Sequence, residues 1–84
     1  MSNPEIHITY WKAWGGAAKF AAAEKAIMSR YPGAKFTSTA ESGFTSNFIV
    51  IVNGTEVWNN KGNTGKFSPS RTGDLMTLVE GVAC

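Results

Sequence analysis

The stretch FIVIVNG, residues 48–54, decides the fold predicted for this chain. Its five consecutive apolar residues predict a strand that is apolar on both faces and therefore central in a sheet. Asn53-Gly54 is the preferred pair for a two-residue type I′ turn, so residues 55–58 are expected to return as an antiparallel partner strand. The sequence therefore predicts a hairpin built on a buried strand.

Two segments with regular apolar spacing precede this hairpin. Residues 5–10 alternate, which predicts a strand with His7 solvated or hydrogen-bonded on the face opposite to Ile6 and Ile8. Residues 17–31 change to the helical period and contain six alanines, which favour a helix that lies close on a sheet. The apolar face of this helix is expected to comprise Phe20, Ala23, Ile27 and Tyr31, and Pro32-Gly33 is expected to end it.

The remaining segments complete the order β-α-β-β-β-α. Residues 35–40 predict a strand, and Ser68-Pro69 predicts an N-cap with proline in the first helical position. The helix that follows runs to about residue 82, with an apolar stripe of Leu75, Met76, Leu78, Val79 and Val82. We expect one α/β domain over residues 1–84, a two-layer α+β sandwich. Its four-stranded mixed sheet has a parallel right-handed crossover between the first two strands, and both helices cover one face.

Composition and charge exclude several classes of protein. The net charge is +2, which is too weak for the basic face of a nucleic-acid-binding protein. The single cysteine, Cys84, cannot form an intrachain disulfide or a multi-cysteine metal site. No apolar run approaches the roughly 20 residues of a membrane helix, and the N-terminal residues do not resemble a signal peptide. We therefore expect the cytoplasm or another soluble reducing compartment.

Four short motifs then occur in a characteristic order. They are residues 10–14 (YWKAW) after the first strand, residues 31–33 (YPG) at the helix end, residues 45–50 (TSNFIV) with the Asn53-Gly54 turn, and residues 61–67 (KGNTGKF). In this order and spacing the chain resembles the selenoprotein W (Rdx) family of small thioredoxin-like proteins. It lines up with that family without a gap over residues 10–33. The resemblance covers nearly the whole domain and implies a thioredoxin-like fold.

Two positions depart from the pattern of that family. The family has Tyr-Cys-x-x-Cys or Tyr-Cys-x-x-selenocysteine after its first strand, so the resemblance places Trp11 and Trp14 at the redox positions. An indole has no ionisable S–H or Se–H and cannot attack a disulfide. The family's Thr-Pro before the central strand, whose proline faces the redox pair, corresponds to Glu41-Ser42 here. The resemblance therefore implies a fold that is kept without its thiol chemistry.

We expect a redox-inactive interaction or structural module, an accessory subunit that docks on a larger assembly. A protein partner is expected, and no cofactor, metal, nucleic acid or membrane insertion. At least one of the two indoles is expected to be substantially exposed, because so small a core can hardly bury both. The expected contact residues are Trp11, Trp14, Lys12 and Gly15, with secondary contacts at Ser42, Lys61 and Lys66.

The loop KGNTGKFS, residues 61–68, invites a phosphate-loop interpretation. The spacing G-x-x-x-x-G-K fails because Asn60, and not glycine, lies five residues before Gly65. We expect an ordinary flexible loop, whose Lys61, Lys66 and Arg71 would suit an acidic partner.

Other interpretations stay open on the sequence. Trp11 and Trp14 can simply fill the former redox site by packing, or they can bind a small aromatic ligand or pigment. The alternative function is a thiol or selenol oxidoreductase of the selenoprotein W family. It would act through Cys84, or through a cysteine–selenocysteine pair in the authentic gene product, since the codons for Trp, Cys and selenocysteine differ by a single base.

Overall fold

Four strands and two α-helices make up the part of the chain that the computed structural model describes, residues 4–11, 15–42, 47–62 and 64–83. In chain order the elements are β1 (Glu5–Trp11), α1 (Gly16–Arg30), β2 (Lys35–Glu41), β3 (Phe48–Val52), β4 (Thr55–Asn59), a 3₁₀ turn η1 (Pro69–Arg71) and α2 (Thr72–Ala83). This is the predicted β-α-β-β-β-α order. No helix within these ranges is both long enough and apolar enough to cross a membrane.

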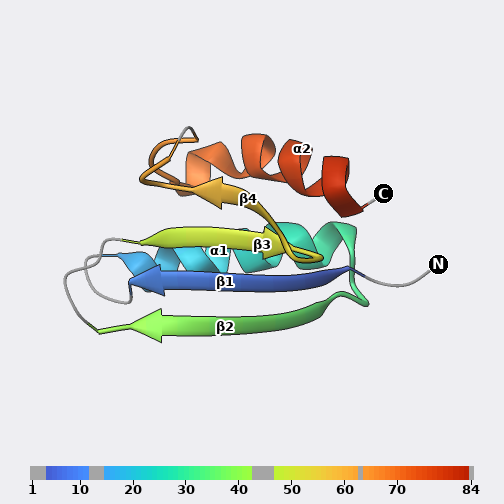
Figure 1. Ribbon diagram of the computed structural model, residues 1–84, viewed down its shortest axis with the longest axis horizontal. Helices are drawn as coiled ribbons and strands as arrows, with labels where there is room; N and C mark the ends of the chain where they lie inside the picture. Colours follow the sequence, from blue (N-terminus) through green and yellow to red (C-terminus); the bar gives the residue numbers. More distant parts are fainter. Residues whose placement is uncertain (1–3, 12–14, 43–46, 63, 84) are drawn as a thin grey trace.

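The strands form one mixed sheet in the order β2-β1-β3-β4 (Figure 1). β1 pairs with β2 in parallel and with β3 antiparallel, and β3 pairs with β4 antiparallel. The prediction that β3 is an inner strand is confirmed, since it has a partner on each side. The parallel β1–β2 pair makes the carboxyl ends of both strands meet at one end of the sheet, where α1 begins (Figure 1).

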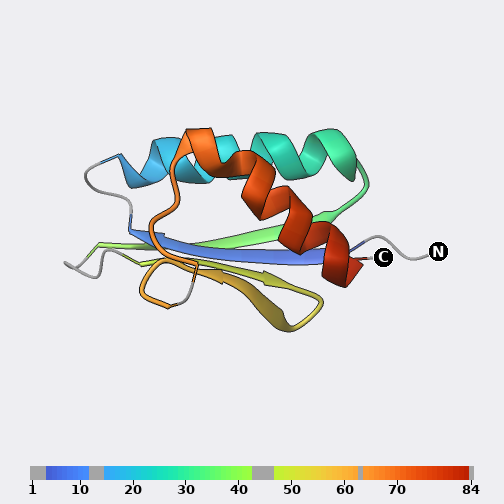
Figure 2. The same ribbon diagram turned by 90° about the horizontal axis from the view of Figure 1, so that it is seen from above.

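Both helices cover one face of the sheet, as predicted (Figure 2). The core between the layers contains Ile6, Ile8, Ala23, Ile27, Phe48, Val50, Val52, Trp58, Phe67, Leu75 and Val79, each at most 3% exposed. Strand alternation gives this core its inward side chains from β1 and β3, and the methyl group of Ala23 lets α1 lie close on the sheet. The opposite face of the sheet, which we call the open face, is covered by neither helix (Figure 2).

The hairpin turn has the predicted geometry. Both central residues have positive φ, 51° for Asn53 and 84° for Gly54, as a type I′ turn requires. Asn53 also fastens the turn to β1, because its Oδ1 accepts a hydrogen bond from the N–H of Glu5 at 2.9 Å. Its own N–H donates to the carbonyl oxygen of Glu5 at 2.8 Å. The turn thus anchors the first residue of the neighbouring strand.

The start of the last helical segment is confirmed in position but not in helix type. Ser68 is the N-cap residue and Pro69 follows it as predicted, but residues Pro69–Arg71 form a 3₁₀ turn and α2 itself starts at Thr72. The Ser68 side chain does not cap either helix, and its hydroxyl lies 2.8 Å from that of Ser70 instead. Leu78 does not belong to the buried stripe, since it is 37% exposed. It follows Leu75 by three residues but lies on the outer side of the helix.

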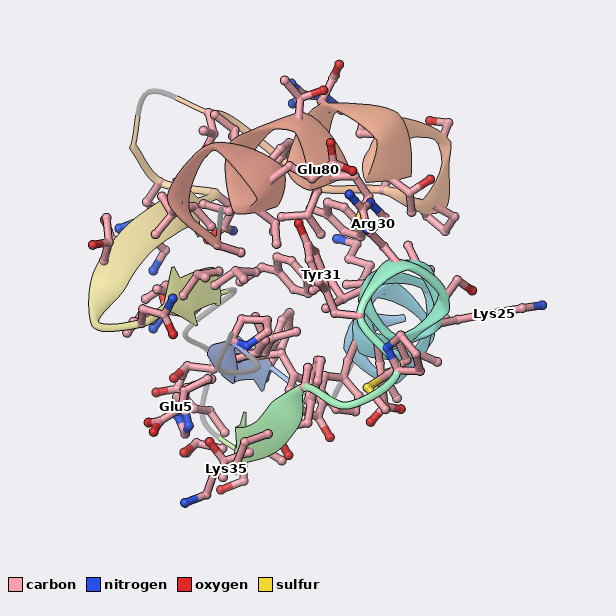
Figure 3. The ribbon with its side chains drawn as sticks, turned by 90° about the vertical axis from the view of Figure 1, so that its right-hand side faces the viewer. Glu5, Lys25, Arg30, Tyr31, Lys35 and Glu80 are labelled. Carbon is pink, nitrogen blue, oxygen red and sulfur yellow. The ribbon has the colours of Figure 1, made fainter. Side chains whose placement is uncertain are left out.

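The two helices also meet at their ends. Arg30 of α1 and Glu80 of α2 point toward one another, with Nε and Oε2 3.5 Å apart (Figure 3). The Arg30 guanidinium lies 5.0 Å from the centre of the Tyr31 ring, which follows the last residue of α1. The ion pair is 59% and 42% exposed, so it contributes at most about 1 kcal/mol to stability.

Candidate functional site

The candidate site is the β1–α1 corner, which we define as Trp11, Gly15, Gly16, Glu41 and Asn47. Trp11 is the last residue of β1 and is half-buried. Its N–H donates to the carbonyl oxygen of Asn47 at 2.9 Å, and it lies opposite Glu41 in the β1–β2 register. The backbone that carries the first indole is therefore fixed by neighbours on both sides.

Two glycines bring α1 against the end of β1. Gly15 has φ +83°, a conformation that residues with a Cβ rarely adopt. Gly16 is buried, and a Cβ on it would overlap the carbonyl oxygen of Trp11. Gly15 was predicted as a contact residue, and the structure gives it a conformational role in the turn. The pair of glycines places the N-terminus of α1 directly beside Trp11.

A side-chain hydrogen bond connects the two strands that flank β1 at the corner. The Nδ2 group of Asn47 donates to Oε1 of Glu41 at 3.0 Å, in partly buried surroundings. This bond joins the carboxyl end of β2 to the residue before β3. Ser42, which follows Glu41, is exposed. The sequence did not reveal this bond, because its partners belong to different elements and match no motif.

The described side chains of the corner are an indole, a carboxylate and an amide. They provide apolar area and hydrogen-bonding oxygens, the indole nitrogen of Trp11 is buried, and none of these side chains is a thiol nucleophile. Two of the predicted contact residues, Lys12 and Trp14, lie outside the described residues, as does Cys84. Exposure of Trp14 therefore stays a prediction, while Trp11 is half-buried.

The described residues of the loop after β4 make several hydrogen bonds, and the flexibility expected of this loop stays a prediction. Asn59 and Thr64 bond reciprocally: the Asn59 N–H donates to the Thr64 hydroxyl at 3.0 Å, and that hydroxyl donates to the Asn59 carbonyl oxygen at 2.9 Å. Asn60 and Phe48 are also joined by two hydrogen bonds. The Asn60 Oδ1 accepts from the Phe48 N–H at 2.8 Å, and the Asn60 N–H donates to the Phe48 carbonyl oxygen at 3.1 Å. The loop is thereby tied to the start of β3, next to Asn47.

Arg71 holds the second half of this loop. Its Nη1 donates to the carbonyl oxygens of Thr64 at 2.8 Å and Lys66 at 3.0 Å, and its Nε donates to Asp74 at 3.2 Å. Its guanidinium also lies 4.7 Å from the centre of the Trp58 ring. Asp74 thus gives Arg71 an acidic neighbour within the chain, and contact of Arg71 with an acidic partner stays a prediction. Lys66 remains exposed.

Phe67, in the loop after β4, packs against two aromatic side chains of the core. Phe67 stacks on Phe48 with ring centres 4.6 Å apart, and it meets Trp58 edge-on at 5.4 Å. The loop and the corner lie at the same end of the molecule (Figure 1). Ser42, Lys61 and Lys66, the predicted secondary contacts, are all exposed residues of the segments that reach this end.

The opposite end of the open face has a shallow cavity of about 260 Å³, with Glu5, His7, Lys35 and Thr37 in its lining. The ring of His7 lies 2.8 Å from the Thr37 hydroxyl and 3.1 Å from the Thr39 hydroxyl, which confirms that it is hydrogen-bonded. Within the described ranges, no three His, Cys, Asp or Glu residues come together as a metal site would need.

Comparison with known proteins bears on the fold. The sequence matches no protein-family model and no curated protein sequence. The structure is similar to the crystal structure of a selenoprotein W-related protein from Vibrio cholerae, with a TM-score of 0.76 and 14% identity over 99% of this chain and 100% of that one. It is also similar to a crystal structure from Bordetella parapertussis, with a TM-score of 0.63 and 14% identity over 90% and 96% of the two chains.

These likenesses span nearly the full length of each chain but only 14% of residues are identical, so they establish the fold alone. The four-stranded mixed sheet, the two helices on one face and the corner between β1 and α1 all belong to that fold. The chain therefore has a thioredoxin-like α+β fold of the kind seen in a selenoprotein W-related protein.

Proposed function

We propose that this chain is a redox-inactive relative of selenoprotein W that serves as an interaction or structural module. It acts as an accessory subunit of a larger assembly and docks through Trp11 and Trp14. The observation that carries the proposal is the place of Trp11, at the carboxyl end of β1 and beside the first residues of α1. The resemblance puts the redox pair of the family at residues 11 and 14.

Thiol chemistry at this place depends on an ionised sulfur or selenium. A helix N-terminus lowers the pKa of a neighbouring cysteine, and the resulting thiolate attacks a disulfide. The indole of Trp11 has no proton that can leave at neutral pH and no lone pair for such an attack. The position keeps the helix N-terminus and lacks the group that the helix would activate.

The corner has properties that suit a protein contact. Tryptophan is enriched among the residues that contribute most to protein–protein binding. The backbone bond of Trp11 to Asn47 and its pairing with Glu41 hold the backbone of Trp11 in place before a partner arrives. A backbone that is already fixed loses less conformational entropy on binding, which favours affinity. The partner is a protein in a soluble reducing compartment, and Ser42, Lys61 and Lys66 make secondary contacts.

The test is a binding measurement on the complex that the tagged full chain forms in its own cells. After the partner has been identified, affinities are compared for the native chain and for the variants Trp11→Ala and Trp11→Ala/Trp14→Ala. We expect the double variant to lose ~2 kcal/mol, about 30-fold in Kd. Leu78→Ala, which removes exposed apolar surface from α2, is the matched control and should bind normally. Unchanged affinity of the double variant would reject docking through this corner.

The alternative function is a thiol or selenol oxidoreductase, and the likeness to a selenoprotein W-related structure is the observation that favours it. Its nucleophile would be Cys84, or a cysteine–selenocysteine pair at residues 11 and 14 of the authentic gene product. Intact mass of the protein from its natural source, with sequencing of the transcript at codons 11 and 14, distinguishes the two functions. A mass that requires sulfur or selenium at these residues supports the oxidoreductase.

A further inference from the structure

β2 is one of the two edge strands of the sheet, and most of its residues are exposed. It runs over seven residues, KFTSTAE, at the edge of the order β2-β1-β3-β4. None of its residues is buried, and Phe36 and Glu41 are the two that are partly covered. Burial of its side chains therefore contributes little to holding this strand in the fold, and its outer edge offers unpaired backbone groups.

The other edge strand is protected and β2 is not. β4 is shorter, carries an irregularity in its pairing opposite Val50 and Ile51, and packs against α2. Bulges, short length and a covering helix are the usual ways in which an edge avoids pairing with another chain. Between Lys35 and Glu41, β2 has no charge, no proline and no irregularity in its register with β1.

The direction of the free backbone groups follows from one hydrogen bond. The Lys35 N–H donates to the carbonyl oxygen of Pro4 at 3.0 Å, so the N–H and C=O of Lys35 face β1. Backbone groups alternate in direction along a strand. The N–H and C=O groups of Phe36, Ser38 and Ala40 therefore face outward, away from the sheet.

The sequence of β2 is complementary to itself about Ser38. In an antiparallel pair of two copies centred there, Ser38 lies opposite Ser38, and Thr37 lies opposite Thr39. The bulky Phe36 lies opposite the small Ala40. The charge pattern agrees, because Lys35 of each copy comes to lie opposite Glu41 of the other. Opposite charges at facing positions stabilise antiparallel strands.

We propose that β2 is a dimerisation edge and that its partner is a second copy of this chain. The two β2 strands pair antiparallel about a two-fold axis at Ser38. Phe36 exchanges both of its backbone hydrogen bonds with Ala40 of the second copy, and the two Ser38 residues exchange theirs. The sheets of the two copies become continuous. This contact shares Glu41 with the corner but uses neither Trp11 nor Trp14, so it goes beyond the proposed function.

The surroundings of the strand permit this arrangement. A two-fold axis perpendicular to the sheet keeps the helices of both copies on the same side. Figure 3 shows α2 far from the edge that carries Lys35, and α1 nearer to it on the helix-covered face. Lys35 makes no ion pair within the described ranges. Glu41 accepts a hydrogen bond from Asn47 of its own chain through Oε1.

The contact is symmetric, so it closes on itself and yields dimers rather than fibres. An edge of seven residues buries less than the ~1,200 Å² of a standard stable interface. The dimer is accordingly weak and depends on concentration and on salt.

Charge reversal on the purified full chain tests the proposal. Sedimentation velocity at ~10 μM to ~1 mM should show native dimers that increase with concentration. In Lys35→Glu the facing pair becomes Glu–Glu, and in Glu41→Lys it becomes Lys–Lys, so each variant alone should remain monomeric. In an equimolar mixture every facing pair is attractive again, and the heterodimer should form. Glu56→Lys, the same charge reversal on the opposite edge strand, is the matched control and should dimerise normally.

A second variant is independent of charge. Ser38→Pro removes an outward N–H without removing a bond to β1, and it should abolish dimers while the circular dichroism spectrum keeps its native form. Three results would overturn the proposal: a native chain that stays monomeric to ~1 mM, a mixture that forms no heterodimer, or dimers lost in Glu56→Lys instead. Trp11→Ala/Trp14→Ala should dimerise like the native chain, so this proposal and the docking role can fail separately.

Discussion

The carbonyl oxygen of Trp11 lies against the α-carbon of Gly16, across the turn that leads from β1 into α1. No side chain fits between them, because a Cβ on Gly16 would overlap the backbone of Trp11. This approach sets the start of α1 beside the end of β1. The geometry of the corner therefore depends on a residue that the sequence analysis did not single out.

Replacement of Gly16 should destabilise the fold strongly. In Gly16→Ala the overlap is with backbone, which cannot rotate away, so we expect a loss of about 3 kcal/mol in the free energy of unfolding measured in urea. Gly81→Ala is the matched control, since Gly81 lies in α2 with open space around its Cα and the variant should gain roughly 0.5 to 1 kcal/mol. Equal effects of the two variants would refute the close approach.

Asn53 should show two separable contributions to stability. Asn53→Gly keeps the positive φ but loses the hydrogen bond from the Glu5 N–H, which should cost about 1 kcal/mol. Asn53→Ala adds the cost of a left-handed conformation, so its loss should reach about 2 kcal/mol. Thermal and urea unfolding of both variants measure the difference. An alanine variant as stable as the glycine variant would contradict the turn geometry.

Arg71 should matter through the carbonyl oxygens that it binds rather than through its ion pair. Arg71→Met loses the bonds to Thr64 and Lys66 and the contact with the Trp58 ring, and we expect a loss of about 2 kcal/mol. Asp74→Asn removes the exposed ion pair alone and should cost at most about 0.5 kcal/mol. Amide hydrogen exchange in residues 64–67 should accelerate in the first variant, and unaltered exchange there would count against the assigned role.

Restoring the redox pair should create thiol chemistry in this scaffold. Trp11→Cys/Trp14→Cys introduces two thiols in the segment between β1 and α1, and a helix N-terminus lowers the pKa of a neighbouring cysteine. We expect an intrachain disulfide, visible as a mass loss that dithiothreitol reverses, and catalysed reduction of insulin disulfides. The single variant Trp11→Cys is the control and should form no such bridge. A double variant that forms no bridge would argue against the correspondence of residues 11 and 14 with the redox pair.

The sequence was sufficient to predict the fold where local signals were strong. Residues 48–54 predict a strand that is apolar on both faces, followed by an Asn-Gly turn, and the structure has both. The Ser68-Pro69 pattern predicted the N-cap position correctly, but it did not show that residues Pro69–Arg71 form a 3₁₀ turn before α2. Leu78 was misplaced because apolar character alone does not say which side of a helix faces the core.

The candidate site was predictable only in part. The place of Trp11 at the end of β1 followed from the strand pattern and the family spacing. Two features of the site were not predictable: the hydrogen bond between Asn47 and Glu41, and the hydrogen bonds from Arg71 to the loop. Both join side chains to groups that are distant in the secondary structure, and no sequence spacing specifies such contacts. One signal was available for Gly16, because a Gly-Gly pair at a strand-to-helix junction suits a close backbone approach.

The central claim is that the β1–α1 corner has no thiol chemistry. Its most direct test is a disulfide-reduction assay on the native full chain, measured with and without alkylation of Cys84. Insulin turbidity with dithiothreitol as reductant gives the rate, and Trp11→Cys/Trp14→Cys is the positive control. The proposed function predicts that the native chain, alkylated or not, reduces insulin no faster than dithiothreitol alone. Turnover well above background that alkylation abolishes would contradict it.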